Sequence, residues 1–249
     1  MKINAKIAKP LLLSAAAIML VVATVFATMA YMTSSAAVSN VFTVGNVKLH
    51  MYESKVDQDG KVLQGTDPAT GMKPTDTNSY HLVPGATYVK DPTVYVDGGS
   101  DASYLFIRLR NDLKSIEKQG DPNHPTMLEQ LKKNGWLEIE RAASNVDAVF
   151  VYVGVDVSGY VDAAEYFDAG HTVPTVGNTA ERVQYKVFEE FTLKNQVENL
   201  SIFGGARVAI VAYAIQARLP GYDTDETRGT EAAIRAAWAY IKAELPFVV

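Results

Sequence analysis

The first thirty residues constrain this chain most, because they decide where the remainder has to fold. Three lysines precede residues 11–32, which contain no charged side chain and carry small side chains at Thr28 and Ala30 near their far end. This order is typical of an export signal that is cleaved between Ala30 and Tyr31. We therefore predict a signal peptide over residues 1–30, and a secreted protein of the extracellular matrix or cell surface.

The same apolar stretch is long enough to raise an alternative. A helix that spans a bilayer needs roughly 20 apolar residues, so an uncleaved N-terminal anchor competes with cleavage. We expect cleavage, since small and β-branched residues crowd the far end of the stretch. The richest later apolar run, residues 208–217, is shorter and is closed by Arg218 and Pro220, which argues against several membrane spans.

Composition narrows what the exported part can be. The chain has no cysteine, so an exported domain has to be stabilised by its hydrophobic core without disulfides. Residues 1–30 hold three Lys and no acidic residue, so the remaining 20 basic and 28 acidic residues leave a net charge of −8. Such an acidic surface argues against nucleic acid as a partner.

Short runs of β-favouring residues alternate with turn clusters along the exported part, which predicts an all-β antiparallel β-sandwich. The expected strands after the first cover residues 93–96, 104–110, 136–139, 149–157, 183–188 and 208–216. The last of these is apolar on both faces and should be a central strand. Two helices are expected: a capping box at Thr126 and Glu129 begins one, and residues 230–245 carry Trp238 at helical spacing.

The N-terminal part of the exported chain has a different pattern. Residues 41–53 form the first long strand candidate, and the alternation changes phase at Gly45, where we expect a kink or bulge. Residues 31–44 carry no charge and few large side chains. Such a segment gains little by folding onto its own body, but it could pair with the open sheet edge of a neighbouring molecule. The alternative is a leader whose strand pairs only within its own domain.

No catalytic constellation is recognisable, so we expect no enzyme, no catalytic or metal-ligating residue and no cofactor. The four histidines are not paired at helical spacing, and neither a zinc-protease motif nor a nucleophile elbow occurs. Calcium is the remaining chemical alternative, because Asp57 and Asp59, and Asp223 and Asp225, cluster oxygens in loops. Acidic turns of this kind more often cap their own backbone.

Several blocks of the chain resemble the camelysin/TasA family. They are Asn40 to Leu49 (NVFTVGNVKL), Tyr80 to Val94 (YHLVPGATYVKDPTV), Ser100 to Arg108, Ala212 to Ala217, and Ala236 to Trp238. The resemblance implies a jelly-roll β-sandwich over residues 46–249, exported from a Gram-positive bacterium through a SipW-type signal peptidase. It also implies a subunit of biofilm matrix fibres, with an accessory matrix subunit as a further expected partner.

These observations combine into one expectation. We predict a secreted subunit that polymerises with itself, head to tail, by donor-strand complementation, with residues 31–45 as the donor segment. Val38, Val41, Phe42 and Val44 are the side chains expected to fill the groove of the next subunit. Two alternatives stay open: a camelysin-like surface metalloprotease, and a membrane-anchored surface protein that binds a partner through exposed tyrosines such as Tyr152, Tyr160, Tyr166 and Tyr222.

Overall fold

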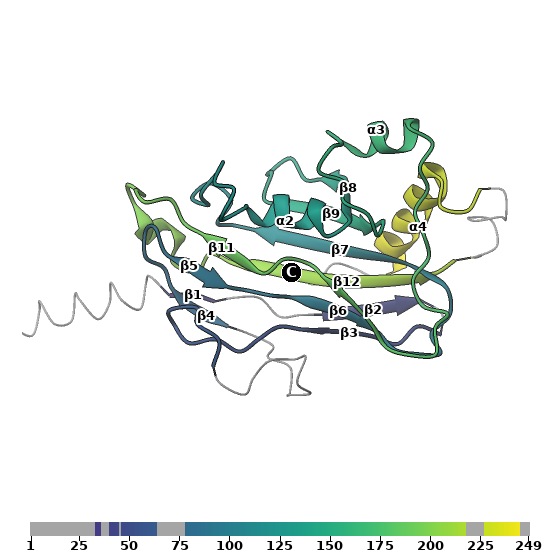
Figure 1. Cartoon of the computed structure of the whole chain (residues 1–249), viewed down its shortest axis with the longest axis horizontal. Helices are drawn as coiled ribbons and strands as arrows, with labels where there is room; N and C mark the ends of the chain where they lie inside the picture. Colours follow the sequence, from purple (N-terminus) through teal and green to yellow (C-terminus); the bar gives the residue numbers. More distant parts are fainter. Residues whose placement is uncertain (1–32, 36–39, 45, 64–77, 218–226, 245–249) are drawn as a thin grey trace, which may run out of the picture.

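A computed structural model describes residues 33–35, 40–44, 46–63, 78–217 and 227–244 (Figure 1). The strands are β1 (Thr33–Ser35), β2 (Asn40–Val44), β3 (Leu49–Tyr52), β4 (Ser79–His81), β5 (Thr87–Val89), β6 (Thr93–Val96), β7 (Ser103–Asn111), β8 (Trp136–Arg141), β9 (Asp147–Tyr152), β10 (Val183–Lys186), β11 (Glu190–Thr192) and β12 (Val208–Gln216). The helices are α2 (Met127–Lys133), α3 (Ala163–Asp168) and α4 (Glu231–Glu244), with a 3-10 turn, η2, at Leu200–Phe203.

The strands form one large and three small sheets. The five-stranded sheet has the order β2-β12-β7-β9-β8, and the three-stranded sheet has the order β10-β6-β3. β11 pairs with β5, and β1 pairs with β4. Every described pairing is antiparallel except that of β2 with β12, which is parallel. The prediction of a mostly antiparallel all-β protein with few helices is confirmed.

Alternating side chains place the five-stranded sheet between two apolar layers. Leu105, Ile107 and Leu109 of β7 point to one side and join a core with β3, β6 and β10. Tyr104 and Phe106 point to the opposite side and join a second cluster with α3 and α4. Because both faces of this sheet are covered, β12 and most of β9 read as nearly continuous apolar runs, whereas the second half of β7 alternates with Arg108 and Arg110.

Of the three described helices, α2 and α4 begin where the sequence predicts, whereas α3 is not among the expected helices. Thr126 and Glu129 form the expected capping box, in which the Thr126 hydroxyl accepts from the Glu129 N–H and the Glu129 carboxylate accepts from the Thr126 N–H. In α4, Ile234, Trp238 and Ile241 are buried against the five-stranded sheet. Among the described helices, none is both long enough and apolar enough to cross a membrane.

The first expected strand differs from the prediction in one respect. Residues 41–53 do not form one kinked strand but two separate strands, β2 and β3, which belong to different sheets. Residues 45–48 connect them, so the predicted break near Gly45 is where the chain passes from one sheet to the other. Strands that change sheets need such a break, because the two sheets present their hydrogen-bonding edges in different directions.

Candidate functional site

The predicted donor segment, residues 31–45, contributes to two sheets: β1 pairs with β4, and β2 lies at the edge of the five-stranded sheet. Backbone pairing places Val41 opposite Ala212, Phe42 opposite Tyr213 and Val44 opposite Ile215. Within the single chain, β2 therefore lies against its own β12. Val38 falls outside the described residues, as do the predicted cleavage residues Ala30 and Tyr31.

β12 is built as an interior strand. Ala212 and Ala214 are fully buried in the core between the two larger sheets, whereas Tyr213 and Ile215 are fully buried on the side of α4. One side of the strand is paired with β7 along its whole length, and β2 pairs with part of the other side. Without β2, a strand that is buried on both faces would expose unpaired N–H and C=O groups at a sheet edge.

The opposite edge of the same sheet is protected by charge. β8 carries Glu138, Glu140 and Arg141, and it pairs only with β9 among the described strands. The Glu140 carboxylate also accepts from the Trp238 indole N–H at 3.1 Å and from Lys242 Nζ at 2.8 Å. Charged side chains on an edge strand oppose pairing with another chain. β12 has no charged residue, so the edge that β12 would present without β2 lacks the charges that protect β8.

The chain is held firmly just after β2. The carbonyl of Asn46 accepts from the Asp101 N–H at 3.0 Å, and the Lys48 N–H donates to the Ser100 hydroxyl at 3.1 Å. Val47 is buried in the core. β2 itself is an edge strand, and its ladder with β12 is its only described strand pairing. The chain from Asn46 onward is therefore firmly attached to the domain, whereas β2 is held along one side only.

Sequence reasoning missed a buried polar cluster beside β4. Lys90 Nζ lies 2.7 Å from Glu53 Oε2, and both side chains are almost completely buried. The Asn78 amide donates to Glu53 Oε1 at 3.0 Å and accepts from the Val56 N–H at 3.1 Å. Burial raises the pKa of the nearby Tyr80 phenol, and the Glu53 carboxylate adds to that effect. Lys and Glu are normally surface residues, so the local sequence did not predict that Lys90 and Glu53 would be buried together.

The described residues contain no group of three or more His, Asp or Glu side chains placed to hold a metal ion. Asp57 Oδ1 accepts from the Asp59 and Lys61 N–H groups, at 3.0 and 2.9 Å, as in a backbone-capping turn. His50 lies 3.0 Å from Asp97, and His124 lies 3.2 Å from Glu190. Asp223 and Asp225, the other calcium alternative, fall outside the described residues.

The expectation that several tyrosines are exposed is wrong for one of them. Tyr166 is buried against Tyr160 and Phe167, because α3 folds its aromatic side over the second apolar cluster. Tyr152 and Tyr160 are half-buried. Tyr222 falls outside the described residues. A binding surface made of these rings would therefore be smaller than the sequence suggests.

No family model, no curated protein and no solved structure matches the chain.

Proposed function

We infer that this protein is a secreted structural subunit of extracellular biofilm matrix fibres, folded as a jelly-roll-like β-sandwich. Subunits join head to tail when residues 31–45 of one molecule add to the next molecule, with β2 paired to its β12 edge. The resemblance of several sequence blocks to the camelysin/TasA family supports this proposal. The observation that carries it is that β12, uncharged and buried on both faces, is an interior strand only when β2 lies beside it.

The chemistry of strand exchange fits the two edges described above. A donated strand gains affinity from the backbone ladder and specificity from alternate side chains. Because the donor and the acceptor edge are different surfaces, each subunit offers one of each, and the contact does not close on itself. The charged β8 edge opposes pairing on the other side, so subunits add through the β12 edge alone.

Engineered cysteines test whether β2 is exchanged between molecules. Neighbouring strands lie about 4.8 Å apart, within the range that a disulfide spans. Val41 and Ala212 are partners in the β2–β12 register, and the natural chain has no cysteine to interfere. We expect oxidised extracellular fibres of a Val41→Cys/Ala212→Cys variant to give a ladder of covalent oligomers on non-reducing electrophoresis.

The matched control keeps the same acceptor position. Ile107 is the partner of Ala212 on β7, so Ile107→Cys/Ala212→Cys should cross-link within one chain and run as a monomer. A second variant lacks residues 31–44, and with them β1 and β2, but keeps the export signal, and it should form no fibres by electron microscopy. Fibres whose Val41→Cys/Ala212→Cys subunits are oxidised yet all run as monomers would contradict strand donation, as would normal fibres from the deletion variant.

A further inference from the structure

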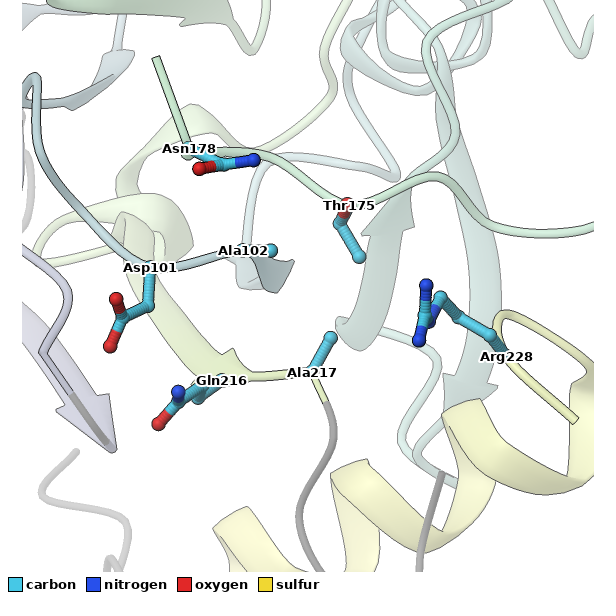
Figure 2. Close-up of a pocket in the computed structure, with 7 residues that line it drawn as sticks. All are labelled: Asp101, Ala102, Thr175, Asn178, Gln216, Ala217 and Arg228. Carbon is cyan, nitrogen blue, oxygen red and sulfur yellow. The ribbon is translucent and has the colours of Figure 1, made fainter. Parts of the chain in front are cut away.

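A pocket opens where β12 ends, apart from the β2 ladder, with a volume of about 370 Å³. Its polar lining comes from four separate segments: Asp101 before β7, Thr175 and Asn178 from the loop before β10, Gln216 at the end of β12, and Arg228 before α4. Figure 2 shows Asp101 and Arg228 on opposite sides of the pocket, with Thr175 and Ala217 between them. The volume falls in the range of small-molecule sites.

Backbone hydrogen bonds hold the walls of this pocket together. Ser103 and Val176 exchange two N–H···O bonds, at 2.8 and 2.7 Å, and the Asn178 N–H donates to the Ser100 carbonyl at 2.7 Å. On the opposite wall, the Ala217 N–H donates to the Ala102 carbonyl at 2.8 Å. These bonds fix the backbone beside Ala102, Asn178 and Ala217, which lowers the cost of ordering these parts of the lining on binding.

The loop that contains Gly177 and Asn178 passes close to the backbone of Asp101. Gly177 has φ +80°, and a Cβ at this position would come within 2.6 Å of the Asp101 carbonyl oxygen. Asn178 follows with φ +55°, which makes it one of two described non-glycine residues in the left-handed region. A side chain is disfavoured there, although asparagine tolerates the region better than most residues. Backbone conformations of this kind concentrate at functional sites.

The lining narrows the chemistry of a ligand. The Asp101 carboxylate and the Arg228 guanidinium carry opposite charges. The pocket therefore favours neither a phosphate, which needs positive charge, nor a metal cation, which needs negative charge. Asn178, Gln216 and Thr175 both donate and accept hydrogen bonds, and a ligand of hydroxyl groups does the same. A compact zwitterion would use the two charged groups and leave these three side chains without a role.

We propose that this pocket binds a neutral saccharide unit through its hydroxyl groups. Apart from alanine methyl groups the lining is polar, and no aromatic ring among the described residues lines it for stacking on a sugar. Each site should therefore bind weakly, with a dissociation constant on the order of 1–10 mM. A polymer of subunits would present many such sites, and multivalency turns weak single sites into firm attachment to a polysaccharide.

The test uses the full chain and methyl glycosides of glucose, galactose and N-acetylglucosamine, with binding followed by saturation-transfer NMR. Asn178→Gly removes the carboxamide while glycine keeps the left-handed backbone, and it should weaken binding about three- to tenfold. Asn145→Gly is the matched control, since Asn145 is the other left-handed asparagine and does not line this pocket. It should bind as the natural chain does.

Three results would overturn the proposal. The first is an absence of binding by all three glycosides at concentrations of about 50 mM, well above the expected dissociation constant. The second is binding that Asn178→Gly leaves unchanged or that Asn145→Gly weakens equally. The third is binding of glycylglycine, a zwitterion probe, in place of the glycosides. None of these measurements requires fibres, so this proposal and that of strand donation fail separately.

Discussion

Replacing Lys90 with methionine should lower the free energy of unfolding by about 3–5 kcal/mol. The Lys90 side chain is 1% exposed and the Glu53 side chain 6% exposed, with 2.7 Å between Nζ and Oε2. Methionine fills a similar volume but leaves the Glu53 carboxylate buried without its cation. Desolvation of an uncompensated charge is what makes the loss large. Urea unfolding followed by circular dichroism measures it.

Two further variants make this result specific to the buried pair. Lys186→Met removes the cation of the Lys186–Glu189 pair, in which both side chains are more than half exposed, and should change stability by less than about 1 kcal/mol. Lys90→Met/Glu53→Gln neutralises both buried partners and leaves an acceptor for Asn78, so it should recover most of the loss. A Lys90→Met variant that loses no more stability than Lys186→Met would contradict the buried-charge account.

Glu117 should make the protein less stable as the pH rises from about 4.5 to 7. Burial raises the pKa of this carboxyl to about 7, and the Glu129 carboxylate adds to that, against the lowering effects of the Met127 N–H, the Asn111 amide and Lys114. A carboxyl whose pKa is higher in the folded state contributes stability below its unfolded pKa and loses it as the pH rises through the folded value. A shift of this size corresponds to about 3 kcal/mol.

Glu117→Gln isolates this contribution because it removes the titratable carboxyl group. The glutamine carbonyl oxygen can still accept from the Met127 N–H, whose nitrogen lies 2.6 Å from Glu117 Oε1. The difference in unfolding free energy between the variant and the natural chain should move by about 3 kcal/mol in favour of the variant between pH 4.5 and 8. Urea titrations across this range measure it. Glu181→Gln, at an exposed position, should show no such change. A flat difference for Glu117→Gln would contradict the raised pKa.

The sequence predicted the elements whose own residues determine them. The alternation from Leu105 to Arg110 sets both faces of β7, and the capping box at Thr126 begins α2 at the expected residue. The two apolar faces of residues 208–216 correctly indicated a strand paired on both sides. In each case the signal is local, because side-chain period and capping chemistry are properties of a few consecutive residues.

The features that the sequence did not predict depend on contacts between residues that are distant in the sequence. β4, β5 and β11 have three residues each and are strands only through their pairings, so no periodicity reveals them. The alternation of residues 41–53 marks faces but not which sheet each half joins. The burial of Lys90 follows from Glu53, thirty-seven positions earlier, and the pocket beside Asn178 gathers residues from across the chain.

Under the proposed strand donation, the short connection between β2 and β3 would make assembly depend on the protein concentration. Only residues 45–48 join the two strands, so a released β2 meets its own β12 at an effective concentration of millimolar order, as for any short tether. On this proposal, dilute subunits would keep β2 on their own β12, and neighbours would compete for the strand only at a comparable protein concentration. The proposed secretion into a confined space outside the cell would supply that concentration, while each molecule in transit would keep its β12 edge covered.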